Sequence, residues 1–227
     1  LSGTPDYVRG CLSSWRIFHF HDTSNTSSMR KMSKLEDTSF LRQDGSNLAA
    51  FLYFLRENFN DSYQLIRKTI QMVTPFFDDF DLKPSKNKEN IKLEWKHKKS
   101  DAYFGPSSLS DGTLRFIALA TLFLQPAEYK PSVILIDEPE LGLHPAAITL
   151  LASLIKSASK EVQVIASTQS SLLLDYFNPA DVIVAERKNE GTVLTRLEEE
   201  PLKEWLEDYS LGQLWEKNEI GGRPSHE

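Results

Sequence analysis

The sequence predicts an α/β protein in which a largely parallel sheet with flanking helices is joined to a mixed lobe of helices and antiparallel strands. From Leu109 onward, strand-like and helix-like segments alternate, which is the pattern of a parallel α/β layer. Residues 132–136 form a continuous apolar run, as expected of a central strand covered on both faces. Residues 91–96 instead alternate strictly between apolar and polar, which predicts a strand with one face in water.

Local signals place the other elements. Residues 15–20 alternate like a half-buried strand, and residues 23–37, rich in Ser, Thr, Lys and Arg, predict a mobile loop. Helices are expected where apolar residues recur at helical spacing or follow a cap or proline signal, at residues 48–55, 61–73, 114–124, 145–159 and 202–209. A second strand of the parallel layer is expected at residues 162–166, and a hairpin at residues 182–197.

These patterns divide the chain into three parts. Residues 1–108 are expected to form a mixed α+β lobe with a helical subdomain, and residues 109–200 the parallel core that carries the chemistry. Residues 201–227 are expected to add a last helix and a loose tail. The sequence shows no repeats and no sustained heptads, so we expect no long coiled coil within this chain.

Composition excludes several classes of protein. The chain has 26 Lys and Arg against 32 Asp and Glu, and its net charge of −6 gives no overall basic field to attract nucleic acid or an anionic membrane. The single cysteine, Cys11, cannot form an internal disulfide and suits a reducing compartment. Its apolar runs are far shorter than the roughly 18 residues of a membrane span, and we recognise no signal peptide. We therefore expect a cytoplasmic protein with no membrane partner.

Two histidines deserve separate consideration as metal ligands. His19 and His21 have the i, i+2 spacing of one strand face. A zinc site needs three or four ligands, and no cysteine or acidic cluster lies nearby to supply the others. We favour their interpretation as ordinary strand residues.

The clearest functional signal is the acidic pair Asp137 and Glu138, directly after the apolar run. Open α/β sheets bind ligands at the carboxyl ends of their strands, so both carboxylates are expected at a ligand site. Asp137 would hold Mg²⁺, through water because that ion dehydrates reluctantly, and Glu138 would orient and polarise an attacking water. Alone the pair is a weak motif, and a solvated acidic turn is the other interpretation.

The neighbouring segments strengthen the functional interpretation. Ser110, Gly112 and Thr113 precede an apolar helix, where a hydroxyl and unhindered N–H groups suit a phosphate. Ser110 would serve equally well as a plain N-cap. Downstream, residues 139–145 lead into the next helix, and residues 165–170 end the next strand with polar side chains. Four features in this order are hard to obtain by chance.

Together these segments resemble the ABC-type ATPases of the RecF-like and SMC-like branch, over residues 109–175. The matching motifs are the signature (LSDGT, 109–113), Walker B (ILIDE, 134–138), the D-loop (ELGLHP, 140–145) and the switch loop (TQS, 168–170). The resemblance implies the C-terminal part of a P-loop ATPase head that forms a head-to-tail homodimer. ATP and Mg²⁺ would lie between Walker A and B of one subunit and the signature residues Ser110, Gly112 and Thr113 of the other.

Two features depart from that family. The phosphate loop G-x-x-x-x-G-K-[ST] is missing, because Gly3 and Gly10 have the wrong interval and no Lys follows. Since the first residue is Leu1, we expect the Walker A segment upstream or on another polypeptide, and this chain alone to be inactive. Gln169 stands where the family often has His. Gln can hydrogen-bond a γ-phosphate or a water but cannot become a cation, so we expect slow hydrolysis.

The resemblance implies ATP binding and hydrolysis that drive a conformational change in DNA repair, chromosome maintenance or antiphage defence, with a DNA or protein partner. A second interpretation is a non-catalytic module whose dimerisation is gated by nucleotide. A nuclease is disfavoured, because no further acids cluster on strand ends after Thr168 to hold paired metals. The seven lysines of residues 83–99 suit either a nucleic-acid backbone or a solvated strand face, and we favour the latter.

Overall fold

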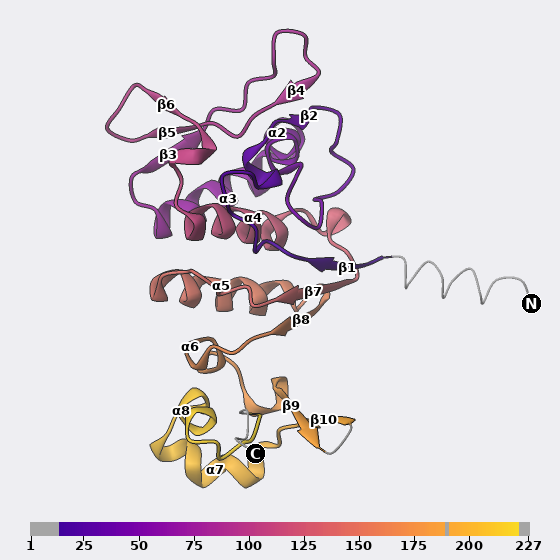
Figure 1. Ribbon diagram of the computed structural model, residues 1–227, viewed down its shortest axis with the longest axis vertical. Helices are drawn as coiled ribbons and strands as arrows, with labels where there is room; N and C mark the ends of the chain where they lie inside the picture. The colour runs from indigo at the N-terminus through magenta and orange to yellow at the C-terminus, as the bar shows by residue number, and fades with distance from the viewer. Residues whose placement is uncertain (1–13, 189–190, 223–227) are drawn as a thin grey trace, which may run out of the picture. The chain divides into compact units, whose positions relative to one another are not determined.

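The computed structural model describes residues 14–188 and 191–222 and divides the chain into two compact units (Figure 1). The first unit ends at Ser167 and the second begins at Thr168. Cys11, the glycines considered for a phosphate loop, the hairpin turn and the end of the predicted tail lie outside the described residues. The division into three parts at residues 108 and 200 stays a prediction.

The first unit contains eight strands and four α-helices in the described range. Its strands are β1 (Trp15–Phe18), β2 (Ser33–Lys34), β3 (Phe77–Phe80), β4 (Asn90–Ile91), β5 (Trp95–His97), β6 (Tyr103–Phe104), β7 (Val133–Asp137) and β8 (Gln163–Ser167). Its helices are α2 (Leu48–Asn58), α3 (Asn60–Val73), α4 (Asp111–Leu124) and α5 (Pro145–Ala158). Each predicted helix of this unit is therefore present, with ends that differ by a few residues.

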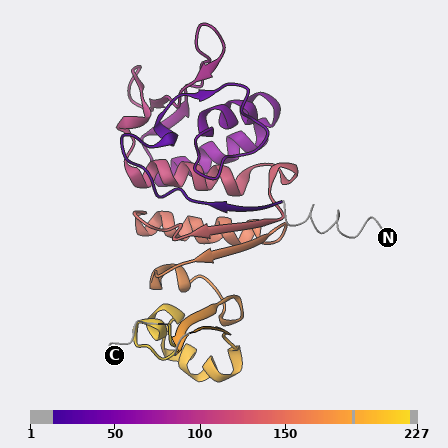
Figure 2. The same ribbon diagram turned by 45° about the vertical axis from the view of Figure 1, so that its right-hand side comes forward.

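Strand β7 is the centre of the parallel sheet, as its apolar run predicts (Figure 2). It pairs in parallel with β1 along one edge and with β8 along the other. The register aligns Ile17, Leu135 and Ile165 across the three strands, so these side chains share one face. Ile17 and Ile165 are each 47% exposed, whereas Ile134 on the other face is fully buried. Among the described residues, the predicted cover on both faces is thus found on one face only.

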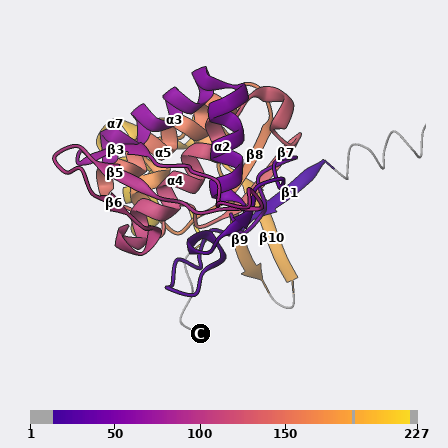
Figure 3. The same ribbon diagram turned by 90° about the horizontal axis from the view of Figure 1, so that it is seen from above.

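The helices of the first unit pack on one another beside this sheet (Figure 3). Helix α4 contacts both α3 and α5, and α2 contacts α3. The predicted apolar stripe of α3 buries Tyr63, Ile66 and Ile70, while Val73 at the helix end is only half-buried. Tyr63 donates a hydrogen bond to Asp79 Oδ1 (2.6 Å), and burial together with this carboxylate raises the pKa of the phenol.

The predicted strand at residues 91–96 is divided in the structure. Burial does alternate along it, with Ile91, Leu93 and Trp95 buried and the residues between them half-buried. Its start, however, belongs to β4 and pairs with β2, while its end belongs to β5 and pairs with β3 and β6. The alternation therefore reports one buried face correctly but does not show that the two ends join different sheets.

The predicted mobile loop at residues 23–37 is instead firmly anchored. It contains a 3₁₀ turn (Ser28–Arg30) and strand β2. Met29 is 2% exposed, Ser27 is fully buried, and Ser27 Oγ donates to the carbonyl of Asp22 at 2.6 Å. The prediction was wrong because polar composition hides a single apolar anchor and a buried arginine, whose partners are distant in sequence.

In the part of the second unit that the structure describes, there are a hairpin, three α-helices and a short 3₁₀ turn. Strands β9 (Ile183–Lys188) and β10 (Gly191–Arg196) pair antiparallel, as predicted, and the helices are α6 (Ser171–Leu174), α7 (Glu199–Asp208) and α8 (Leu211–Glu216). Helix α8 packs on α6: Gly212 N–H donates to Asp175 Oδ1 (2.7 Å), and a Cβ on Gly212 would overlap the carbonyl oxygen of Ser171. In the described ranges, each helix is too short or too polar to cross a membrane.

Candidate functional site

The carboxyl edge of the parallel sheet carries the first part of the site. Asp137 and Ser167 end β7 and β8 and are register partners, so their side chains emerge on the same face. Asp137 is exposed, and Ser167 Oγ donates a hydrogen bond to its carboxylate. The sheet therefore presents a carboxylate and a hydroxyl together, where polar ligands of such sheets bind.

Glu138 has an unusual backbone conformation. Its φ is 37°, in the left-handed region that residues with a Cβ seldom adopt and that recurs at functional sites. Its N–H donates to the carbonyl of Ser167 (2.9 Å), and the preceding carbonyl, that of Asp137, is in contact with His21 Nε2 (2.7 Å). The half-buried Glu138 is thus held by both neighbouring segments of the sheet edge.

The oxygen donors at this edge fit Mg²⁺. A hard cation prefers carboxylate and hydroxyl oxygens, which Asp137 and Ser167 supply. Within the described ranges, no three His, Cys, Asp or Glu side chains gather as a protein-only metal cage. Mg²⁺ usually keeps several waters and is shared with substrate phosphates, so a carboxylate and a hydroxyl can serve as its protein ligands.

The start of α4 forms a second part of the site. Ser110 is the N-cap of this helix: its hydroxyl accepts from Thr113 N–H (3.2 Å) and lies 2.8 Å from Thr113 Oγ1. Ser110 therefore does act as an N-cap, as one of its two interpretations predicts. Ser110 is also exposed, so its hydroxyl remains accessible, and the phosphate-binding role of Ser110, Gly112 and Thr113 stays a prediction.

Gly112 packs against the segment that follows Glu138. A Cβ on Gly112 would overlap the carbonyl oxygen of Gly142, which itself has a φ of 74°. The side chain is therefore excluded at position 112 by a contact within the chain. Close backbone approach joins the start of α4 to the segment resembling the D-loop, and substitutions of Gly112 would disturb this contact before they affected any ligand.

A buried arginine holds the backbone that leads into α4. Arg30 Nε donates to the Thr23 carbonyl (2.9 Å), and its two terminal nitrogens donate to the carbonyls of Leu109 (3.2 and 3.3 Å) and Pro106. Nη2 also pairs with Asp111 at 2.8 Å. The Arg30 side chain is 4% exposed, and that of Asp111 68%. Arg30 thus fixes residues 106–111 and offsets the negative charge of Asp111 at the helix start.

A second arginine links α4 to the segment after β1. Arg115 is 5% exposed, and its Nε and Nη2 donate to the carbonyls of Phe20 and His21, both at 2.9 Å. Burial lowers the pKa of Arg115, and the charge of Asp111 opposes that shift. An arginine stays protonated in proteins, so its charge and donors are retained here.

Gln169 belongs to the second unit. It is exposed and lies between β8 and α6, where Ser170 caps the short helix by accepting from Leu173 N–H (3.2 Å). Ser170 N–H in turn donates to Thr168 Oγ1 (3.0 Å). The turn around Gln169 is therefore ordered by its neighbours, and the role of Gln169 toward a phosphate or a water stays a prediction.

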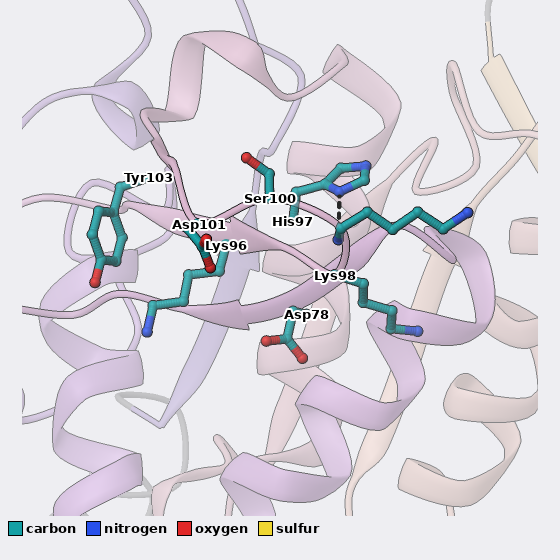
Figure 4. A pocket seen from close by; sticks show the side chains of 8 residues that line it. Asp78, Lys96, His97, Lys98, Ser100, Asp101 and Tyr103 are labelled. Carbon is teal, nitrogen blue, oxygen red and sulfur yellow. Dashed lines mark hydrogen bonds between the residues drawn. The ribbon is translucent and has the colours of Figure 1, made fainter.

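The lysine-rich lobe contains an open hollow of about 500 Å³ (Figure 4). Its lining includes Lys96, Lys98 and Lys99 together with Asp78 and Asp101, and the side chains of Lys96 and Lys98 extend in different directions. Lys96 also lies over the Tyr103 ring, with Nζ 5.2 Å from its centre. Three lysines and two acids line the hollow, so the choice between a nucleic-acid backbone and a solvated strand face stays a prediction.

Three residues that shape this site were not predicted from the sequence. His21 and Arg30 escaped because their partners are backbone carbonyls of distant segments, which no sequence pattern reveals. Arg115 did leave a signal: it is a charged residue inside the apolar helix run 114–124. A buried charge in such a run must be paired or hydrogen-bonded, which marks it as a structural donor.

Comparison with known proteins decides the family. The family model described as "AAA domain, putative AbiEii toxin, Type IV TA system" matches residues 14–175, most of the chain. The chain belongs to this AAA family. The match includes the acidic pair of β7 and the start of α4. A comparison of this chain with curated protein sequences found no match.

Solved structures confirm the predicted fold. One, from work titled "Structural biochemistry of ATP-driven dimerization and DNA stimulated activation of SMC ATPases", is 22% identical, has a TM-score of 0.50, and covers 69% of this chain and 94% of its own. An Smc head bound to the C-winged helix domain of ScpA is 20% identical to this chain, with a TM-score of 0.58. The match covers 83% of this chain and 57% of that structure's chain. A Pyrococcus furiosus Smc head with an extended coiled coil, bound to the C-terminal domain of ScpA, is 21% identical to this chain, with a TM-score of 0.53. The match covers 69% of this chain and 39% of that structure's chain.

The chain therefore has the fold of SMC ATPase heads, as the resemblance predicts. It spans 57% and 39% of the length of the two Smc head structures with ScpA domains. The expectation that this chain is only the C-terminal portion of a head stays a prediction.

Replacing Arg30 by Met should lower the free energy of unfolding of the AAA domain by about 2 to 4 kcal/mol, because several buried carbonyls would lose a charged donor. Urea unfolding followed by tryptophan fluorescence measures this loss. The matched control is Arg42→Met, since Arg42 is 44% exposed and pairs with Asp37 at 2.7 Å. It should cost less than about 1 kcal/mol. Equal losses in the two variants would contradict the bracing role of Arg30.

Proposed function

We propose that the AAA domain is part of an ATPase head that binds and hydrolyses ATP to drive a conformational change. The observation that carries this proposal is the arrangement of Asp137 and Glu138 at the carboxyl edge of a parallel sheet. Asp137 is exposed beside Ser167, and Glu138 is held in a left-handed conformation by hydrogen bonds of its flanking peptide. A strained acidic residue at a sheet's ligand-binding edge suits a chemical role better than a solvated turn.

The two carboxylates would divide the work. Asp137, with Ser167, would hold Mg²⁺, which when bound with ATP neutralises charge developing on the phosphates. Glu138 would accept a hydrogen bond from the attacking water and orient it. Gln169, in the second unit, would hydrogen-bond a γ-phosphate or a water. Each of these roles uses a side chain that can reach solvent, since Asp137 and Gln169 are exposed and Glu138 is half-buried.

The start of α4 would contact the ATP of a second subunit. Its free N–H groups and dipole favour an anion, and Ser110 adds a hydroxyl. Asp111 alone would oppose a phosphate here, but Arg30 pairs with it at 2.8 Å and offsets its charge. This local neutrality supports a phosphate-facing helix start, and with it a head-to-tail homodimer joined by ATP.

A phosphate loop is still required, and we propose that another segment or another chain provides it. The apolar face of the sheet that bears Ile17 and Ile165 supports this, because parallel sheets normally have both faces covered. Trp15, also 47% exposed, alternates onto the same face. A helix that carried the missing phosphate loop would cover these side chains.

A non-catalytic, nucleotide-gated dimerisation module is the second candidate. The exposed Gln169, which cannot become a cation, favours it over fast hydrolysis. Steady phosphate release by protein expressed from the complete coding sequence supports the enzyme, and ATP binding without release supports the module. We also propose that the protein acts in the cytoplasm with a DNA or protein partner. The process that it serves would be DNA repair, chromosome maintenance or antiphage defence.

Replacing Glu138 by Gln, in protein expressed from the complete coding sequence, should preserve ATP binding and lower turnover by about 10² to 10⁴-fold, because a positioned base contributes that much. Phosphate release and equilibrium ATP binding are the two measurements. Glu128→Gln makes the same chemical change at an exposed position on another turn and should leave turnover unchanged. Unchanged turnover in Glu138→Gln would assign the catalytic role to another residue.

Ser110 tests the contact across the dimer more cleanly than Gly112, whose substitution would disturb the contact with Gly142. Asp and Asn both cap helices well, so Ser110→Asp and Ser110→Asn should preserve α4. In the Glu138→Gln background, Ser110→Asp should weaken ATP-dependent dimerisation at least about tenfold, because its carboxylate repels the phosphate, while ATP affinity of the monomer barely changes.

Ser110→Asn supplies the control, because it is neutral and close to Asp in shape. It should dimerise much better than Ser110→Asp, as measured by sedimentation velocity with ATP. If the Asp and Asn variants dimerise equally well, the start of α4 is a helix cap only and the signature assignment fails.

A further inference from the structure

We propose that His21 is a positioning residue for Glu138: its imidazole fixes the peptide bond between Asp137 and Glu138 and thereby sets the direction of the Glu138 carboxylate. The inference rests on the proposed role of Glu138 in hydrolysis. It concerns a residue of the segment after β1, which is 116 positions from Asp137 in the sequence.

The peptide bond in question is held from both sides. Its carbonyl, that of Asp137, lies 2.7 Å from His21 Nε2, and its N–H, that of Glu138, donates to the carbonyl of Ser167 at 2.9 Å. Because a peptide unit is planar, two hydrogen bonds at its opposite edges fix the orientation of the whole plane. Ser167 supplies one bond from β8, and His21 supplies the other from the segment after β1.

This orientation determines the backbone of Glu138. The peptide plane sets φ, and the observed φ of 37° is one that a residue with a Cβ adopts only when its surroundings impose it. Loss of the His21 bond would remove one of the two hydrogen bonds that hold this peptide plane and so favour relaxation toward negative φ. Such a relaxation would turn the Cα–Cβ bond and carry the carboxylate away from its present position.

The contact also defines the tautomer of His21. A carbonyl oxygen can only accept a hydrogen bond, so Nε2 must carry the proton, and in the neutral ring Nδ1 is then unprotonated. The side-chain amide of glutamine has its nitrogen at about the reach of Nε2, whereas that of asparagine ends nearer the backbone, at about the reach of Nδ1. Replacing His21 by Gln or by Asn therefore shows whether the hydrogen bond from the Nε2 position is required or whether any polar side chain suffices.

His21 is itself held in place by helix α4. Arg115, buried in α4, donates to the carbonyls of Phe20 and His21 at 2.9 Å each. The backbone of His21 is thus fixed by α4 while its side chain fixes the Asp137–Glu138 peptide. A residue so placed can orient the carboxylate without touching a substrate.

The kinetic test compares four proteins expressed from the complete coding sequence. His21→Ala should lower kcat at least about tenfold, through the lost positioning of a group that contributes 10² to 10⁴ in rate, and leave KM for ATP nearly unchanged. His21→Gln should recover most of kcat, and His21→Asn should not. His19→Ala removes the exposed imidazole whose ring centre lies 6.5 Å from that of His21 but leaves the bond of His21 to the Asp137 carbonyl in place, and it should leave kcat nearly unchanged. Unchanged kcat in His21→Ala, or recovery by Asn but not by Gln, would overturn the proposal.

A second readout needs no turnover and uses the 227-residue chain itself. Long-range ¹H–¹⁵N spectra should show His21 with a protonated Nε2, and the ¹³C shift of the Asp137 carbonyl should move in His21→Ala and return in His21→Gln. A neutral His21 protonated at Nδ1, or an Asp137 carbonyl ¹³C shift that does not change in His21→Ala, would overturn the proposed hydrogen bond. A complete protein without ATP turnover would instead overturn the proposed function, and the positioning role with it, while the spectra still report whether the hydrogen bond exists.

Discussion

The parallel pairing of β7 along both of its edges is the constraint on which the rest of the first unit depends. Because β1 and β8 run in the same direction as β7, all three strands end at one edge of the sheet. That edge collects Asp137, Ser167 and the segment that contains His21, although these residues come from three distant parts of the sequence. A slip of one residue in the register would turn Asp137 to the opposite face and part it from Ser167.

Irregular backbone around this edge needs donors, and two buried arginines provide them. A guanidinium has five N–H groups in a fixed plane, so one side chain satisfies several carbonyls at once. Arg30 does this for the backbone that leads into α4, and Arg115 for the backbone that leaves β1. Both arginines fasten segments that would otherwise present unpaired carbonyls to the interior. The local stability of the site therefore depends on charged residues that touch no ligand.

The start of α4 and the segment after Glu138 behave as one structural piece. The backbone of Gly142 occupies the space that a side chain on Gly112 would need, and Arg115 connects the same helix to His21. The signature-like and Walker B-like segments are thus coupled inside one chain. In a dimer joined by ATP, a contact made at Ser110 would act on α4. Arg115 in the same helix holds the segment of His21, which in turn would orient Glu138.

The sequence by itself determined the elements that follow local rules. The apolar run predicts β7, Pro145 predicts the start of α5, and Ser110 before an apolar helix predicts the N-cap that the structure contains. These predictions succeed because strand burial, proline geometry and capping depend on neighbours within a few residues. The acidic pair at the end of β7 was located for the same reason.

Tertiary structure alone decided the contacts between distant segments. The division of residues 91–96 between two sheets, the burial of Met29 and the contact of His21 with Asp137 depend on partners far along the chain. Composition and periodicity describe one segment at a time and carry no record of such partners. Gly112 shows the difference plainly: its sequence context suggests room for a phosphate, whereas the fold places the backbone of Gly142 against it.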